Sequence, residues 1–441
     1  MQKTLKSHGT WIGKWTFVLA ATGSAVGLGN IWGFPFKAGT EGGGAFVLIY
    51  LLCIVLIGLP IMLSEILIGR RSGNSPINSM KKSAIDSDVS SAWQGVGWIG
   101  ISAGILILSF YSVIAGICLK YIFVSASSND LDTAGQFLSI VNSPKELMLW
   151  HTIFMGLTMF IVSAGVKKGI GRVVKILMPM LGLLLIFMVV YGIINGDFKE
   201  ALSFLFKPDF TKITSDTFLV AMGQAFFSLS LGMGSIMAYG AYMSKDQNIA
   251  STSVSVGALD TLVAIMAGLA VFPIIFAIQG LEASGGPGLV FISLQTAFNT
   301  MDFGNIIGPI FFILLSVAAL SSSISILEPG VAYLAEEGYL SRTKSAIIIS
   351  IICWLIGIGT AFGFDQDGNN FFQANVELIS VNIMQPLGGM LIAIFIGWFM
   401  KESLIKDELG NINQAIYQIW RIFIKFVAPI GVGIVLISQL F

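Results

Sequence analysis

Long apolar segments separated by short polar stretches dominate the hydrophobic pattern of this chain. A helix needs about 20 apolar residues to cross a bilayer. Eleven segments approach or exceed that length, and they cover residues 11–36, 43–69, 96–124, 148–165, 173–194, 217–243, 253–279, 306–336, 343–363, 372–400 and 415–440. The pattern therefore predicts an all-α polytopic membrane protein with eleven transmembrane helices and one integral domain over residues 1–441. A further apolar stretch at 284–299 is short and glycine-rich, which predicts a re-entrant or surface hairpin.

Two of the predicted spans, the first and the sixth, are interrupted by residues that break helices. Residues 20–36 contain Gly23, Gly27, Gly29, Gly33 and Pro35, and residues 221–240 contain Ser228, Ser230, Gly232 and Gly234. Glycine costs a helix about 1 kcal/mol and proline about 3 kcal/mol relative to alanine. Unwound backbone at membrane depth must be buried in protein or line a cavity, where it offers carbonyls to cations and N–H groups to carboxylates. A glycine-rich packing face remains the alternative for either stretch alone.

Composition and charge narrow the functional class. The chain is 55% hydrophobic and 11% charged, whereas soluble domains carry about 25% charged residues. The formal net charge is zero, and no basic run favours nucleic acid as a partner. Cys53, Cys118 and Cys353 all lie in apolar segments, which favours buried thiols over disulfides or a zinc site. The first span leads into its glycine motif without a cleavage site. No nucleophile–base pair or phosphate loop is found, so the sequence predicts neither an enzyme nor an organic cofactor.

The distribution of Lys and Arg between the predicted loops sets the orientation. With the N-terminus in the cytoplasm, 18 of the 24 basic residues fall on the inner side and 6 on the outer side. Cytoplasmic loops of membrane proteins carry such an excess. The sequence therefore predicts a multi-pass protein of the cell (inner or plasma) membrane with a cytoplasmic N-terminus and an external C-terminus.

The first interrupted span carries a long and specific motif. Residues 23–35 read Gly-Ser-Ala-Val-Gly-Leu-Gly-Asn-Ile-Trp-Gly-Phe-Pro, followed by Gly-Gly-Gly-Ala-Phe at 42–46. This motif, with residues 224–234 and 318–323, resembles the neurotransmitter:sodium symporter family, and within it the bacterial sodium-coupled amino-acid transporters of LeuT-type fold. The resemblance covers nearly the whole chain. It implies two inverted repeats of five helices, 11–194 and 217–400, with broken helices 1 and 6, and an additional helix at 415–440.

The resemblance implies two sodium sites. The first would use the Ala25 carbonyl, the Asn30 side chain, Ser228 and the substrate carboxylate. The second would use the carbonyls of Gly23, Val26 and Ala318 and the hydroxyls of Ser321 and Ser322. Because substrate and ion would share a carboxylate, each would raise the affinity for the other. The alternative for the serines is hydrogen bonding to carbonyls of their own helix.

Asp260 is the most informative intramembrane charge, because it lies well inside the seventh apolar segment. A carboxylate at that depth is costly and indicates a functional site. Family members place an asparagine sodium ligand nearby, and chloride-dependent members add a serine for chloride. We hypothesise that Asp260 binds sodium directly or replaces chloride, which makes transport chloride-independent. The alternative is a structural ion pair, for which the sequence offers no obvious buried base.

The resemblance also implies a substrate pocket. The Tyr111 hydroxyl and the N–H groups of Leu28 and Gly29 would meet the substrate carboxylate. Carbonyls near Ala25 and Phe227, with the Ser230 region, would receive the amine. The walls would come from Ile107, Phe227, Met233, Ser322 and Ile326. These walls are nearly all apolar, which favours an aliphatic or aromatic amino acid.

Gate positions follow from the same resemblance. Phe227 would cover the substrate as a thin outer gate, and Glu377 would be the acidic partner of an outer pair. The usual arginine position is Gly33 here, so Lys37, one turn on, is the candidate substitute. On the inner side, Trp11 and Glu336 match gate positions and Tyr242 is a candidate brace. Glu65 is expected to support the unwound part of helix 1 by hydrogen bonding.

Together these features predict alternating-access symport of a neutral, hydrophobic or aromatic amino acid, driven by two Na⁺ ions. The partners are the amino acid, sodium and the lipid bilayer. Two alternatives stay open: a sodium-independent amino-acid exchanger of the same fold, and an amino-acid sensor that does not transport. The eleventh helix is either a lipid-facing support or an oligomer contact, and the oligomeric state is not indicated.

Overall fold

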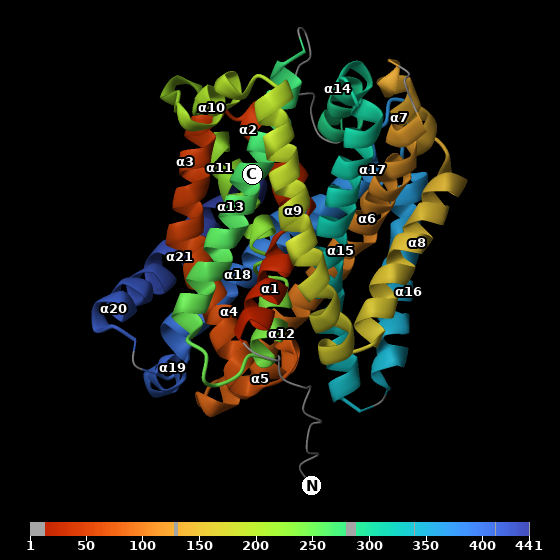
Figure 1. Cartoon of the computed structure of the whole chain (residues 1–441). Coiled ribbons are helices and arrows are strands. Elements are labelled where there is room, and N and C mark those ends of the chain that lie inside the picture. The colour runs from red at the N-terminus through yellow and green to blue at the C-terminus, as the bar shows by residue number, and fades with distance from the viewer. Residues whose placement is uncertain (1–13, 128–130, 279–287, 339, 411, 441) are drawn as a thin grey trace.

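The computed structural model describes residues 14–127, 131–278, 288–338, 340–410 and 412–440, and these residues are almost entirely helical. Long helices run side by side through the molecule, and short helices cover its two ends (Figure 1). Across the described ranges the structure has no strand, only one isolated bridge between Phe364 and Asn370. This agrees with the predicted all-α fold class.

Nine continuous helices within the described residues are long and apolar enough to cross a membrane. They are Gly44–Ser72 (α3 and α4), Ser91–Ser127 (with α6), Pro144–Ser163 (α8), Val166–Asn195 (with α9), Ile249–Phe276 (α13), Gly304–Glu336 (α15), Arg342–Phe362 (α16), Phe371–Phe399 (α17 and α18) and Gln414–Gln439 (α20 and α21). The first predicted span is a pair of helices, Trp15–Ala25 and Gly29–Thr40, bent by 53°. The sixth consists of α11 (Ser215–Ser228) and α12 (Ser235–Ala241). Together these helices account for the eleven predicted segments.

Short helices connect the spans at both ends. They are α5 (Pro76–Asp86), α7 (Thr133–Val141), α10 (Phe198–Phe206), α14 (Gln295–Thr300) and α19 (Glu402–Leu409). The apolar stretch predicted as a hairpin at 284–299 is described from residue 288 onward. It forms a helix over Leu289–Thr300, which is too short to cross a bilayer.

The two breaks arise where the sequence places glycine and serine. The first helix, α1 (Lys14–Ala25), ends within the motif, and a π-helical turn over Gly29–Gly33 leads into α2 (Phe34–Thr40). In the sixth span, Ser230, Gly232 and Gly234 adopt φ of +53°, +74° and +78°. Glycine accepts this left-handed backbone readily, whereas a residue with a Cβ is strained there. The breaks predicted from the helix breakers are therefore present.

A close approach between α4 (Leu59–Ser72) and α12 depends on Gly69. A Cβ added at Gly69 would lie 2.0 Å from the carbonyl oxygen of Met237, a backbone atom that cannot move aside alone. We expect Gly69→Ala to lower the stability by about 1–3 kcal/mol, the usual cost of overpacking a dense core. Gly223→Ala on α11 is the matched control, because nothing lies within 4 Å of its added Cβ. Thermal unfolding of both variants checks this, and equal melting temperatures would contradict it.

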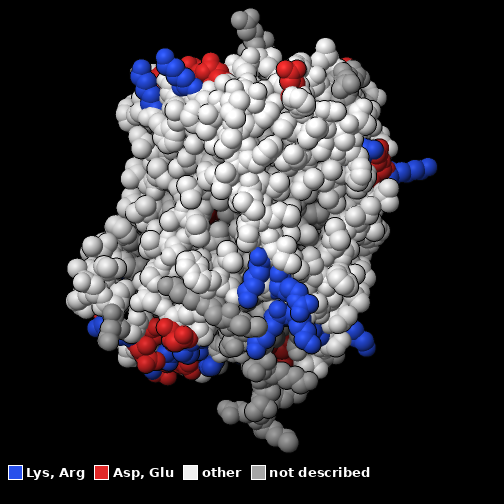
Figure 2. Space-filling model, in the orientation of Figure 1, with Lys and Arg blue, Asp and Glu red and all other residues white. Residues whose placement is uncertain are grey.

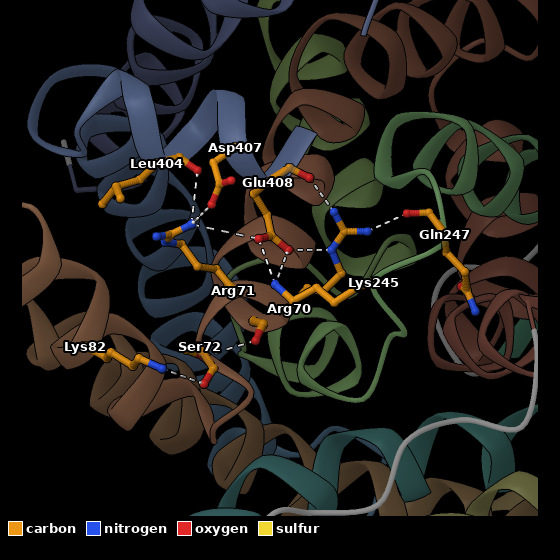
Figure 3. Close-up of polar contacts among 10 residues, drawn as sticks. Arg70, Arg71, Ser72, Lys82, Lys245, Gln247, Leu404, Asp407 and Glu408 are labelled. Atoms are coloured by element: carbon orange, nitrogen blue, oxygen red, sulfur yellow. Dashed lines mark hydrogen bonds and ion pairs between the residues drawn. The ribbon is translucent and has the colours of Figure 1, made fainter. Parts of the chain in front are cut away.

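The buried carboxylate of Glu408 holds together three segments that are distant in the sequence, at the lower end of the molecule (Figure 3). Glu408 of α19 accepts hydrogen bonds from Arg70 Nε at 2.5 Å and from Lys245 Nζ at 2.9 Å. Arg70 also donates to the Gln247 carbonyl at 2.5 Å. The end of α4, the loop after α12 and α19 are thereby held together. Since the Glu408 side chain is only 4% exposed, removal of its cationic partners would leave a buried charge uncompensated.

Candidate functional site

The two helix breaks lie against each other in the interior. Ser230 Oγ donates to the Ser24 carbonyl at 2.8 Å, and Gln224 Nε2 donates to the Gly29 carbonyl at 2.7 Å. Interrupting a helix leaves carbonyls without their usual partners, and in an apolar environment those groups need other donors. Side chains of the sixth span thus satisfy carbonyls of the first. The broken stretches form one polar centre within an apolar bundle.

Asp260 of α13 lies at one side of this centre, in a cluster of buried oxygens. Its Oδ2 accepts a hydrogen bond from Ser228 Oγ at 2.6 Å and lies 3.4 Å from the Tyr50 hydroxyl. Its Oδ1 accepts from Asn30 Nδ2 at 2.7 Å. All four residues are buried. The structure thus unites three predicted residues, Asn30, Ser228 and Asp260, and adds Tyr50 from α3.

No basic side chain of the described residues forms an ion pair with the Asp260 carboxylate. The alternative that Asp260 belongs to a structural ion pair is therefore not supported by these residues. A buried carboxylate requires a compensating charge or proton. Carboxylate, hydroxyl and carbonyl oxygens are the ligands that hard cations prefer. The donor set therefore fits a small cation such as sodium.

The second predicted sodium cluster lies where α15 meets the break in the first span. Ser322 Oγ is 3.0 Å from the Val26 carbonyl oxygen and 3.5 Å from that of Gly23. Ser321 Oγ makes its shorter bond to Ala318 in its own helix, at 2.9 Å, and lies 3.4 Å from the Val26 oxygen. Ser322 thus faces the first span. Ser321 instead bonds mainly to a carbonyl of its own helix, as the alternative for the serines predicts. The predicted groups of both helices are brought together.

A cavity of about 20 Å³ is lined by residues from both broken spans. Tyr111 OH accepts a hydrogen bond from the Leu28 N–H at 3.4 Å beside it. The lining includes every predicted substrate residue except Ile107, which is buried but lies outside the lining. Sequence reasoning missed two members, Ser24 and Gly27, because neither carries a group that marks it as a contact. The lining residues are Ser24, Ala25, Gly27, Leu28, Gly29, Tyr111, Phe227, Ser230, Met233, Ser322 and Ile326.

A larger cavity of about 200 Å³ adjoins the first one. Phe227, Leu28, Gly29 and Tyr111 line both cavities. Gly33, Lys37 and Glu377 line only the larger one, so the cation and the acid predicted for an outer pair face the same space. No ion pair joins Lys37 to Glu377 among the interactions of the described chain. Their role as an outer gate remains a prediction.

Two of the predicted inner-gate residues, Glu336 and Tyr242, hydrogen-bond to different partners at the lower end of the bundle. Glu336 accepts hydrogen bonds from the Ser75 N–H at 2.7 Å and from Asn78 Nδ2 at 2.9 Å, at the beginning of α5. Tyr242 donates to Glu328 Oε1 at 2.7 Å. Trp11 lies outside the described residues. The role of each as a gate therefore remains a prediction.

The cluster around Glu328 was not predicted. Its carboxylate is fully buried and binds Arg342 in a two-pronged arrangement, with Nη1 and Nη2 at 3.0 and 2.5 Å. From the sequence, Arg342 is only one of the 18 basic residues on the predicted inner side. The signal that could have found the pair is a glutamate inside an apolar span, with an arginine just beyond the end of that span.

Glu65 supports a different break from the one predicted. The sequence places it against the unwound part of the first span. In the structure its Oε1 accepts a hydrogen bond from the Gly232 N–H at 2.7 Å, in the break of the sixth span. The difference arises because α4 packs against α12, which directs Glu65 toward the turn before α12. Glu65 thus contacts the break of the sixth span, and its role as a support residue remains a prediction.

The sequence profile of the Sodium:neurotransmitter symporter family matches residues 8–134 and 137–441. This chain belongs to that family. The symporter is 36% identical over 443 residues to an uncharacterized sodium-dependent transporter, YhdH, of Bacillus subtilis (strain 168), and the match covers 97% of each chain. It is 33% identical to an uncharacterized sodium-dependent transporter of Haemophilus influenzae over 99% of each chain.

A solved structure resembles the symporter along its whole length. MhsT in complex with L-phenylalanine superposes with a TM-score of 0.90 at 43% sequence identity. The match covers 98% of the symporter and 100% of the MhsT chain. The predicted LeuT-type fold is therefore confirmed. Because the family consists of transporters, the prediction that the symporter is not an enzyme is confirmed as well.

Proposed function

We propose that this symporter carries a neutral, hydrophobic or aromatic amino acid into the cell together with sodium. The observation that supports this proposal is the small cavity between the broken helices, where exposed backbone groups and Tyr111 adjoin apolar walls. Backbone groups of broken helices suit the carboxylate and amine that all amino acids share. Met233 and Ile326 are uncharged, so these walls of the cavity offer no partner for a charged side chain of the substrate. The phenylalanine bound to MhsT is consistent with this substrate class.

Two sodium ions would provide the coupling. One ion would bind among Ala25, Asn30, Ser228 and Asp260, with the substrate carboxylate as a further ligand. The other would bind among Gly23, Val26, Ala318, Ser321 and Ser322. Each charge that crosses 100 mV releases about 2.3 kcal/mol. Two charges therefore supply enough energy for accumulation of roughly a thousandfold or more, before the sodium gradient is counted.

Transport would proceed by alternating access between two inverted repeats, residues 11–194 and 217–400. Phe227 lines both cavities, and it would close the outer path above the substrate. Glu336 and Tyr242 would close the inner path at the end predicted to face the cytoplasm. The buried charge of Asp260 would stay in place throughout the cycle, so no chloride ion would be needed.

Two other functions would use the same fold. A sodium-independent exchanger would not need the oxygens that surround Asp260 and Ser322. A sensor would bind the amino acid without moving it, so liposomes would show binding but no counterflow. The position of Asp260 without a basic partner in the described residues favours the sodium-coupled proposal over the exchanger, and the counterflow measurement separates it from the sensor.

The decisive experiment is thermal stabilisation of the purified symporter by each of the twenty amino acids, in sodium and in potassium. A ligand at 100 times its Kd stabilises the folded state by about 2.7 kcal/mol. We expect one or a few hydrophobic amino acids to raise the melting temperature in sodium alone. Equal stabilisation in both salts would favour the exchanger. Stabilisation by charged amino acids only would contradict the proposed substrate class.

A further inference from the structure

A cluster of basic side chains marks the lower end of the helix that contains α9 (Gly171–Asn195). Lys167, Lys168, Arg172 and Lys175 lie within nine residues, and all four are exposed. Figure 2 shows a blue group in this region, below a broad uncharged belt. None of the four takes part in an ion pair between described residues. We call these four residues the α9 cation cluster.

Several other basic residues at this end of the molecule have acidic partners. Arg70 and Lys245 bind Glu408, and Arg342 binds Glu328. Lys401 pairs with Asp88, and Lys406 lies 2.8 Å from Glu402. Four like charges close together repel one another unless a counter-charge is near. The α9 cation cluster is therefore available to a negative partner from outside the described chain.

The spacing of the cluster directs it toward lipid. Residues 168, 172 and 175 recur at intervals of four and three, which places them on one face of a helix. The same face continues through Ile176, which is 62% exposed, and Leu183, which is 69% exposed. Large apolar side chains exposed on a membrane-spanning helix face the acyl chains. The cations therefore lie on a lipid-facing stripe, not along a water-filled path.

The cluster also extends along the helix axis. A helix rises 1.5 Å per residue, so Lys168 and Lys175 are separated by about 10 Å along the axis. A cytoplasmic surplus of basic residues explains charges in a loop, but not a stripe that continues onto the lipid-facing surface. A charge at that depth is stable only where its side chain reaches a polar group near the membrane interface. Phospholipid phosphates are the negative groups present at that level.

We propose that the α9 cation cluster binds the headgroup phosphate of an anionic phospholipid. Its acyl chains lie along the stripe that contains Ile176 and Leu183. The helix packs against α1 and α15, and a Cβ added at Gly23 would lie 2.9 Å from Met178 Sδ. The lipid thus binds the outer surface of a helix whose inner surface contacts the broken first span. Its binding stabilises this helix in its packed position.

The test is lipid binding to the purified symporter in a neutral detergent, without sodium or amino acid. Phosphatidylglycerol and phosphatidylcholine are titrated separately, and bound lipid is counted by native mass spectrometry. The wild type is expected to bind phosphatidylglycerol in preference to phosphatidylcholine. For Arg172→Gln/Lys175→Gln we expect roughly 25-fold weaker binding, because each basic residue near an anionic surface contributes about a factor of five. Since no transport substrate is present, the result is independent of the proposed transport function.

A matched control removes two positive charges elsewhere at the same end. Lys81 and Lys344 are exposed and lie on other helices, α5 and α16, so Lys81→Gln/Lys344→Gln should bind phosphatidylglycerol as the wild type does. If the first double variant does not fold, Arg172→Lys/Lys175→Arg keeps both charges and should retain binding. Higher salt should weaken binding to the wild type. Three outcomes would each overturn the proposal: equal losses in the test and control variants, equal binding of the two lipids, or stronger displacement by inorganic phosphate than by chloride at the same ionic strength.

Discussion

Asp260→Asn is expected to raise the sodium concentration required for amino-acid binding by about 100-fold or more. The substitution keeps the shape of the side chain but removes the buried negative charge. Asn30 Nδ2 and Ser228 Oγ both donate to this carboxylate, at 2.7 and 2.6 Å. A neutral amide cannot compensate a cation at the same position, and the cost of an uncompensated buried charge is about 3–5 kcal/mol. Thermal stabilisation by the substrate, titrated with sodium, measures the effect.

The chemistry of the same cluster also predicts a change in anion dependence. Asp260→Ser would shorten the side chain and leave the donors Asn30, Ser228 and Tyr50 around a neutral space. Three donors directed at one point can hold a small anion. Uptake by Asp260→Ser is therefore expected to depend on chloride, whereas uptake by the wild type should be equal in chloride and gluconate. Strict chloride dependence of the wild type would contradict the role proposed for Asp260.

Asp86→Asn serves as the matched control for both experiments. Asp86 is an exposed aspartate at the end of α5, away from both cavities. The same loss of charge there should leave the sodium requirement and the anion dependence unchanged. If Asp260→Asn behaves like Asp86→Asn, the Asp260 cluster does not hold the cation.

The spans and their breaks could be predicted from the sequence because they depend on local properties. Apolar length determines which segments can cross a bilayer, and clustered glycines determine where a spanning helix is interrupted. Gly29, Gly232 and Gly234 marked those places without knowledge of any contact. The motif around them then allowed the candidate ion and substrate residues to be assigned through a family resemblance.

The features that were missed depend on which helices face each other. Ser321 and Ser322 look equivalent in the sequence, but the rotation of α15 brings Ser322 closer to the carbonyls of the first span. Tyr50 is an ordinary residue of an apolar helix until its hydroxyl comes within 3.4 Å of Asp260. Glu65 was assigned to the wrong break because the sequence does not show that α4 packs against α12. These relations are tertiary, and no periodicity in a single chain encodes them.

Arg342→Gln is expected to destabilise the symporter by about 3–5 kcal/mol, because it leaves the Glu328 carboxylate buried without a cation. Glu328 is completely buried, whereas the Arg342 side chain is 21% exposed. Glu328→Gln should therefore lower the stability less, since water can still solvate part of the Arg342 guanidinium group. Tyr242→Phe removes only a hydrogen bond to Glu328 and should cost about 1–2 kcal/mol. Thermal or denaturant unfolding of the three variants measures this order.

The double variant Glu328→Gln/Arg342→Gln tests whether the two side chains stabilise the symporter as a pair or independently of each other. Two amides can hydrogen-bond to each other, so the double variant should be more stable than the sum of the single effects allows, by more than about 1 kcal/mol. Additive effects would contradict direct coupling between the two side chains. Uptake by the same variants then tests the inner gate, because Tyr242 links this pair to the end of α12. If the double variant is stable but transports slowly, the charges themselves are needed when the inner path closes.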